Sequence, residues 1–122
     1  MSKRILVIDD SATVRQQLRQ ALSQAGFEVL EAVDGQDGVM KISSTPSIAA
    51  VICDVNMPNK NGLELIEEVK AKPQHAQLPI MMLTTEGQPA LMKRAKAAGA
   101  SGWIIKPFKA NLLVSAIQKL TG

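Results

Sequence analysis

The sequence predicts an α/β fold in which a five-stranded parallel sheet is covered by helices on both faces. Two observations support this prediction. Short runs of β-branched and apolar residues alternate five times with longer segments whose apolar residues recur at helical spacing. The strand-like runs also lack the polar alternation of half-exposed strands, so both faces of the sheet must be buried. Right-handed strand–helix–strand units produce such a sheet.

The length and composition fit one domain over residues 1–122. Domains most often have about 100–150 residues, and here 46% of the 122 residues are hydrophobic and 20% are charged. No apolar run approaches the ~20 residues of a membrane-spanning helix. The single Cys53 excludes an internal disulfide and is typical of a reducing cytosol. We therefore expect a cytoplasmic protein with no membrane span, and we expect it to be a monomer.

The charge and the aromatic content give no sign of nucleic-acid binding. The net charge is only +3, and one Trp with two Phe provides no platform on which bases could stack. A mildly basic surface explains the charge better.

The predicted elements follow one another without a linker or a repeat. Strands are expected over residues 5–8, 28–32, 50–53, 80–83 and 103–105. Helices are expected over 11–25, around Val39 and Ile42, around 65–69, over 89–98 and around 112–120. Gly26 and Gly99 end the first and fourth helices.

Chemically reactive side chains follow four of the five predicted strands. Asp9 and Asp10 follow the first strand, Asp54 the third, Thr84 the fourth and Lys106 the fifth. Ligands of such sheets bind beyond the carboxyl ends of the strands. If the first and third strands are neighbours, three carboxylates share one cleft, and their repulsion requires a divalent cation such as Mg²⁺. A carboxylate, a metal, a lysine and a hydroxyl together suit phosphoryl transfer.

Each of these residues also has an ordinary structural explanation when taken alone. Asp10 or Ser11 can cap the first helix, and Thr84 or Thr85 can cap the fourth. Lys106 can be a solvated surface lysine, and Asp54 can form a turn. The functional interpretation is favoured because all of these side chains follow strands of one predicted sheet.

The same residues resemble the receiver domains of bacterial response regulators, in particular the single-domain chemotaxis type. The resemblance rests on Asp9-Asp10, on the segment 54–62, on Thr84 and on Lys106-Pro107-Phe108. It covers essentially the whole chain and implies a flavodoxin-like, doubly wound sheet with strand order 2-1-3-4-5 and five helices. It implies a switch that takes a phosphoryl group from a histidine kinase or phosphotransfer protein and then changes its affinity for a downstream target protein.

The resemblance also assigns roles at the site. It implies that Asp54 is the phosphoacceptor and that Mg²⁺ is held by Asp9, Asp10, Asp54 and the backbone carbonyl of Asn56. Lys106, joined to Pro107 by a cis peptide bond, would pair with the phosphoryl oxygens.

Further roles concern the threonines and the lifetime of the phosphoryl group. Thr84 would bond to a phosphoryl oxygen, and Thr85 stands where the family often has a smaller residue, so it would narrow the access of phosphodonors. Asn56 and Glu86 occupy positions where polar residues help water to attack the acyl phosphate. The alternative for Glu86 is a solvated residue at a helix start.

The output surface is expected on the fourth helix, the fifth strand and the fifth helix. Trp103 stands where the family has a Tyr or Phe that moves inward on activation, and the alternative is a fixed, half-buried indole. The residues expected to face a partner are Met92, Lys96, Trp103, Ile105 and Lys119.

Two other functions fit the fold class. A phosphatase with an aspartyl-phosphate intermediate would use Asp54, but its usual second Asp is Asn56 here, and we expect no cap domain to hold a substrate. A flavin binder would need a Ser/Thr/Gly-rich loop after the first strand, where this chain has Asp9-Asp10. We expect the chain to be a complete signalling protein and not a receiver cut from a longer regulator.

Overall fold

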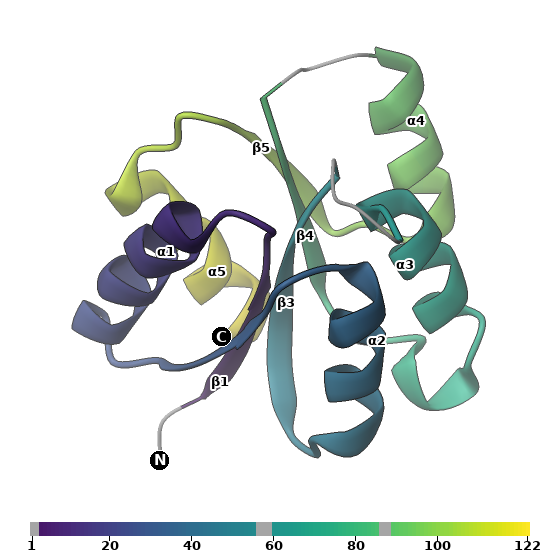
Figure 1. Ribbon diagram of the computed structural model, residues 1–122, viewed down its shortest axis with the longest axis horizontal. Coiled ribbons are helices and arrows are strands. Elements are labelled where there is room, and N and C mark those ends of the chain that lie inside the picture. The colour runs from purple at the N-terminus through teal and green to yellow at the C-terminus, as the bar shows by residue number, and fades with distance from the viewer. Residues whose placement is uncertain (1–2, 56–59, 86–88) are drawn as a thin grey trace.

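The computed structural model describes residues 3–55, 60–85 and 89–122, and its strands and helices alternate as predicted (Figure 1). In chain order the elements are β1 (Arg4–Ile8), α1 (Ala12–Gln24), β2 (Glu28–Ala32), α2 (Gly35–Ser44), β3 (Ile48–Asp54), α3 (Gly62–Lys70), η1 (Pro73–His75), β4 (Ile80–Thr84), α4 (Pro89–Ala98), β5 (Gly102–Ile105) and α5 (Ala110–Thr121).

The sheet has the topology that the resemblance implied. Its five strands are parallel and lie in the order β2-β1-β3-β4-β5. Ile8 is level with Cys53, and Asp54 with Leu83. The residues that follow β1, β3 and β4 therefore meet at one edge of the sheet.

Helices cover both faces of this sheet, as the unbroken apolar strands predicted. Helices α1 and α5 lie on one face and α2, α3 and α4 on the other (Figure 1). Neighbouring strand residues serve opposite layers: Ile52 packs with α1 and α5, and Cys53 packs with the other three helices. Full burial of a side chain such as Ile52 contributes about 1.5–3 kcal/mol. Each layer therefore holds its helices against the strands that carry the site.

Side-chain caps start α1 and α3 at the carboxyl end of the sheet. Ser11 Oγ accepts from the backbone N–H of Val14 at 3.3 Å, so Ser11 is the residue that caps α1. Asn61 and Glu64 form a reciprocal capping box at the start of α3. These two caps begin α1 and α3 at the edge of the sheet that carries the polar side chains.

Two local features differ from the sequence prediction. Strand β3 begins at Ile48, two residues before the expected start at Ala50, because Ile48 pairs with Arg4 across a register shift. A single 3₁₀ turn, η1, precedes β4 and is too short to leave a periodic signal. Among the described residues, no helix is long and apolar enough to cross a membrane.

Candidate functional site

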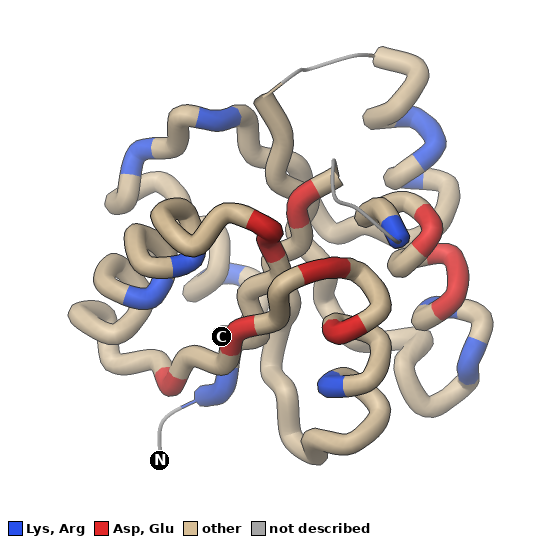
Figure 2. The backbone as a smooth tube through the Cα atoms, in the orientation of Figure 1, with Lys and Arg blue, Asp and Glu red and all other residues tan. Residues whose placement is uncertain are grey.

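Three carboxylates converge where β1 and β3 end. Asp9, Asp10 and Asp54 each offer an oxygen, and these oxygens all lie within 4.8 Å of one another. Figure 2 shows the acidic segments close together at this end of the sheet. Asp9 is fully buried, Asp54 is 4% exposed, and Asp10 faces solvent. Hard carboxylate oxygens with one open side could hold a divalent cation.

Lys106 approaches this cluster from the loop after β5. Its Nζ lies 2.8 Å from Oδ2 of Asp9 and 3.5 Å from Oδ1 of Asp54. Burial lowers the pKa of Lys106, but the hydrogen bond to Asp9 and the charges of Asp54 and Asp9 outweigh burial and raise it above its ordinary value. Lys106 is therefore a cation of the site and not a solvated surface lysine. The peptide bond between Lys106 and Pro107 is cis, as the resemblance implied.

Thr84 ends β4 beside these groups and is fully buried. Its backbone carbonyl accepts from the N–H of Lys106 at 2.6 Å. The two residues are thus tied together through the backbone, so a shift of one end of β4 reaches the loop that positions the lysine.

Gly62 brings the start of α3 against the strand that ends at Asp54. A Cβ at this position would lie 2.4 Å from the backbone oxygen of Asp54 and 3.0 Å from Cα of Val55. The N–H of Gly62 also donates to the carbonyl of Val55 at 3.0 Å. Only a residue without a side chain permits this approach.

Arg15 is a site neighbour that the sequence analysis did not identify. Its Nη1 donates to the backbone carbonyl of Asp9 at 2.6 Å, and Asp9 Oδ1 accepts from the N–H of Ser11 at 2.9 Å. One signal was available in the sequence. Arg15 lies in the first turn of its helix, where a positive charge opposes the helix dipole and acidic residues are usual.

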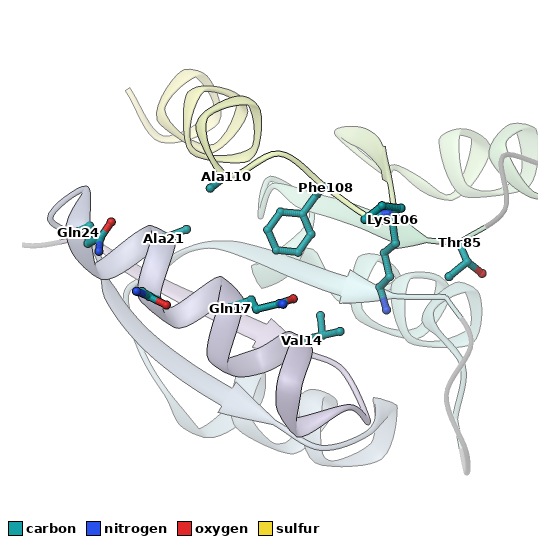
Figure 3. Close-up of a pocket in the computed structure, with 10 residues that line it drawn as sticks. Val14, Gln17, Ala21, Gln24, Thr85, Lys106, Phe108 and Ala110 are labelled. Carbon is teal, nitrogen blue, oxygen red and sulfur yellow. The ribbon is translucent and has the colours of Figure 1, made fainter.

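A groove of about 570 Å³ runs between α1 and the segment that leads into α5 (Figure 3). Phe108 and Ala110 face the helix across it, and Lys106 and Thr85 lie at the end nearest the acidic cluster. Thr85 is exposed and lines this approach, where the sequence analysis expected it to narrow access.

The remaining candidate residues are dispersed. Asn56 and Glu86 lie outside the described residues. Met92, Lys96 and Trp103 line one groove of about 450 Å³ between α4 and β5. Ile105 is 49% exposed and lines a second groove with Trp103, and Lys119 is exposed on α5 but lines neither.

The doubly wound parallel sheet and the acidic, lysine-bearing edge define a receiver, a signalling domain that responds to phosphorylation. The comparison with protein families agrees with this class. The chain belongs to the response regulator receiver domain family, whose model matches residues 5–118. It is therefore a phosphorylation-activated switch of two-component signalling. Membership of this family supports neither of the two alternative functions, phosphatase or flavin binder.

Similar proteins cover almost the full chain. The chemotaxis protein CheY1 of Helicobacter pylori strain J99 is 38% identical, over 98% of this chain and 97% of its own length. A chemotaxis protein CheY homolog of Campylobacter jejuni is 36% identical, over 98% of this chain and 92% of its own. The structure of CheY4 from Vibrio cholerae superposes with a TM-score of 0.92 at 37% identity, covering 98% of this chain and 99% of that one.

Proposed function

We propose that the switch is operated by phosphorylation of Asp54, with a histidine kinase or a phosphotransfer protein as the donor. The observation that supports this most directly is the convergence of Asp54 with Asp9, Asp10 and Lys106 at one edge of the sheet. Asp54 combines a nearly buried carboxylate with a lysine 3.5 Å from its Oδ1. The whole of residues 1–122 forms the receiver, which acts in the cytoplasm and catalyses no reaction beyond its own phosphorylation and dephosphorylation.

The chemistry is a transfer between two nucleophiles. A carboxylate oxygen of Asp54 forms a bond to the phosphorus of a phosphohistidine as the phosphorus–nitrogen bond breaks. The electron pair of that bond returns to the imidazole. Lys106 offsets the negative charge on the phosphoryl oxygens, and the hydroxyl of Thr84 donates to one of them.

Mg²⁺ fits the acidic cluster of this chain. Carboxylate oxygens of Asp9, Asp10 and Asp54 would hold the cation. The family resemblance implies the backbone carbonyl of Asn56 as a further ligand. The metal supplies positive charge that offsets the three carboxylates and the incoming phosphoryl group. The solvent-facing position of Asp10 leaves room for the waters that Mg²⁺ retains.

The groove between α1 and the α5 side gives the phosphodonor protein a place to bind. It reaches Lys106 and Thr85, so a protein segment in it would bring its phosphohistidine to the acidic cluster. Its lining combines apolar side chains with the amides of Gln17, Gln20 and Gln24.

A second surface, between α4 and β5, is proposed for the downstream target. Met92, Lys96 and Trp103 share its groove. Ile105 lines a second groove with Trp103, and the exposed Lys119 of α5 is included in the proposed surface on the family resemblance alone. Apolar contact area with lysines at the rim fits an acidic, amphipathic segment of the partner.

Incubation with acetyl phosphate and Mg²⁺ tests the assignment of Asp54. We expect one added phosphoryl group by intact mass, lost in Asp54→Asn and in the presence of EDTA. The control is Asp37→Asn, which removes a carboxylate from α2 outside the acidic cluster. Labelling that persists in Asp54→Asn would refute the assignment of the phosphoacceptor, and labelling that persists in EDTA would refute the need for a metal.

A further inference from the structure

Arg15 stands at a position where its charge is unfavourable unless other groups compensate it. It lies in the first turn of α1, which has no acidic residue in that turn, and its side chain is only 14% exposed. A cation there opposes the helix dipole. Contacts beyond the helix must therefore hold the guanidinium in place.

Glu31 on β2 supplies one of these contacts. Its Oε1 accepts from Nε of Arg15 at 3.1 Å, and its Oε2 accepts from Nε of Arg19 at 2.7 Å. Lys41 Nζ donates to the backbone carbonyl of Glu31 at 2.5 Å. Glu31 is thus fixed from three sides, and it orients the guanidinium of Arg15.

The oriented guanidinium acts on the end of β1. Nη1 of Arg15 donates to the carbonyl of Asp9 at 2.6 Å, and this carbonyl belongs to the peptide that joins Asp9 to Asp10. The Asp9 carboxylate is held separately, because Oδ1 accepts from the N–H of Ser11 and Oδ2 from Lys106. For Asp10, which faces solvent, the plane of this peptide sets the direction in which the side chain leaves the backbone.

We propose that Arg15 is a positioning residue of the metal site: anchored by Glu31, it fixes the Asp9–Asp10 peptide and so directs the Asp10 carboxylate towards the cation. The proposal rests on the proposed function, since it presupposes that Asp9, Asp10 and Asp54 hold Mg²⁺. Arg15 itself would contact neither the metal nor the phosphoryl group.

Arg19 provides a matched control within the same helix. Both arginines pair with Glu31, but of the two only Arg15 also bonds to the Asp9 carbonyl. Substitution by methionine removes the donors and keeps most of the aliphatic stem, so Arg15→Met retains packing that Arg15→Ala would lose. Arg15→Lys keeps one point charge that can reach the carbonyl or Glu31 but cannot bridge both.

The experiment is urea unfolding of each variant, followed by circular dichroism over a series of MgCl₂ concentrations at constant ionic strength. A cation that binds only the native state raises stability with its concentration, and the dependence gives its dissociation constant even when binding is weak. Loss of a group that orients a metal ligand typically weakens metal binding by about 10–100-fold. We expect Arg15→Met to weaken Mg²⁺ binding about tenfold, near the lower end of that range. For Arg15→Lys we expect a smaller loss, and for Arg19→Met a change within roughly twofold, as for an exposed ion pair.

Labelling with acetyl phosphate gives a second measurement. If Arg15 acts through the metal, saturating Mg²⁺ restores labelling of Arg15→Met to the rate of the unsubstituted protein. Unchanged Mg²⁺ affinity in Arg15→Met would overturn the proposal, even if that variant were less stable. An equal loss of Mg²⁺ affinity in Arg19→Met would also overturn the proposal, because the loss would then come from removing a positive charge near Glu31 and not from the contact with Asp9. Absence of Mg²⁺ binding in the unsubstituted protein would instead refute the proposed function.

Discussion

Lys106 Nζ and Asp9 Oδ2 lie 2.8 Å apart although the two residues are 97 positions apart in the chain. This ion pair joins the loop after β5 to the end of β1, across the edge where Asp54 also lies. One lysine offsets one carboxylate, so the cluster of Asp9, Asp10 and Asp54 keeps an excess of negative charge. The excess explains why this edge would attract a divalent cation, and it makes the stability of the protein sensitive to changes in the cluster.

Neutralising Asp10 is expected to stabilise the metal-free protein. The carboxylate oxygens of the cluster lie within 4.8 Å of one another, and like charges at this separation repel by about 1 kcal/mol when solvent screens them strongly. Asp10→Asn removes one charge from the exposed side of the cluster. We expect the free energy of unfolding without metal to rise by about 1 kcal/mol and the stabilisation by Mg²⁺ to disappear. Urea unfolding with EDTA and with MgCl₂ measures both effects.

The matched control for Asp10→Asn is Asp37→Asn in the first turn of α2. The Asp37 carboxylate accepts from Val33 and pairs with Lys41, so its loss should lower stability and leave the Mg²⁺ effect intact. A less stable metal-free Asp10→Asn variant would contradict the view that repulsion dominates this cluster.

Gly62→Ala is expected to damage both stability and phosphorylation. The added methyl group would lie 2.4 Å from the backbone oxygen of Asp54, so the start of α3 or the end of β3 must move. Overpacking of this kind costs about 1–3 kcal/mol. We expect a loss of this size in urea unfolding, and slower labelling of Asp54 by acetyl phosphate.

Gly26→Ala is the control that separates a general loss of stability from a change beside the phosphorylation site. Gly26 has a φ of +93° and open space around it, at the junction of α1 and β2. Alanine there should cost about 1–2 kcal/mol through backbone strain alone. Acetyl phosphate should label Asp54 in Gly26→Ala at the same rate as in the unsubstituted protein. Equal labelling of Gly62→Ala and Gly26→Ala would show that the approach of α3 to Asp54 does not matter for the chemistry.

The lifetime of the phosphoryl group is expected to depend on Asn56 and Glu86. Each lies two residues after a site residue, Asp54 or Thr84. The amide of Asn56 can orient an attacking water, and the carboxylate of Glu86 can accept a hydrogen bond from it. We expect Asn56→Ala and Glu86→Ala to slow hydrolysis, measured as the decay of phosphorylated mass after removal of acetyl phosphate. Unchanged decay in both variants would leave Glu86 as an ordinary helix-start residue.

The sequence predicted the sheet well because its strands are buried on both faces. Runs such as Ile5–Ile8 and Ile80–Leu83 contain only apolar residues, and this pattern is typical of a strand between two helical layers. The candidate site could be predicted in the same way, because parallel strands end at a common edge, where Asp9 directly follows β1 and Asp54 and Thr84 end β3 and β4. The strand order came from the family resemblance and not from the periodicity.

The contacts that the sequence did not predict depend on spacing in three dimensions. Arg15 reaches the Asp9 carbonyl only because α1 turns back over the end of β1 and β2 places Glu31 beside it. The clash that excludes a side chain at Gly62 is likewise a property of packing, because it arises between α3 and β3. Periodicity identifies which face of a helix is buried, but it does not identify the polar partner at the end of a long side chain.

The structure also suggests a testable coupling between Trp103, on the surface proposed for the downstream target, and the phosphorylation site. Trp103 is half-buried beside the helical layer of α4, and its Nε1 has no hydrogen-bond partner among the residues that the structure describes. An indole in such a place can move without breaking a bond of its own. Thr84 is tied through its backbone carbonyl to Lys106, which follows β5, the strand that contains Trp103.

We therefore expect Trp103 to report on the state of the phosphorylation site. If a phosphoryl group draws the Thr84 hydroxyl towards it, space opens beside β5 and the indole enters it, which gives two states that a partner can distinguish. Trp103 is the only tryptophan, so its emission can be followed while beryllofluoride, a phosphoryl mimic, is titrated with Mg²⁺. The emission should change in the unsubstituted protein and in Thr85→Ala, whose hydroxyl is on an exposed side chain, and it should stay constant in Thr84→Ala. An indole that ignores beryllofluoride would be a fixed core residue. An equal response in Thr84→Ala would show that the signal reaches β5 by a route other than this hydroxyl.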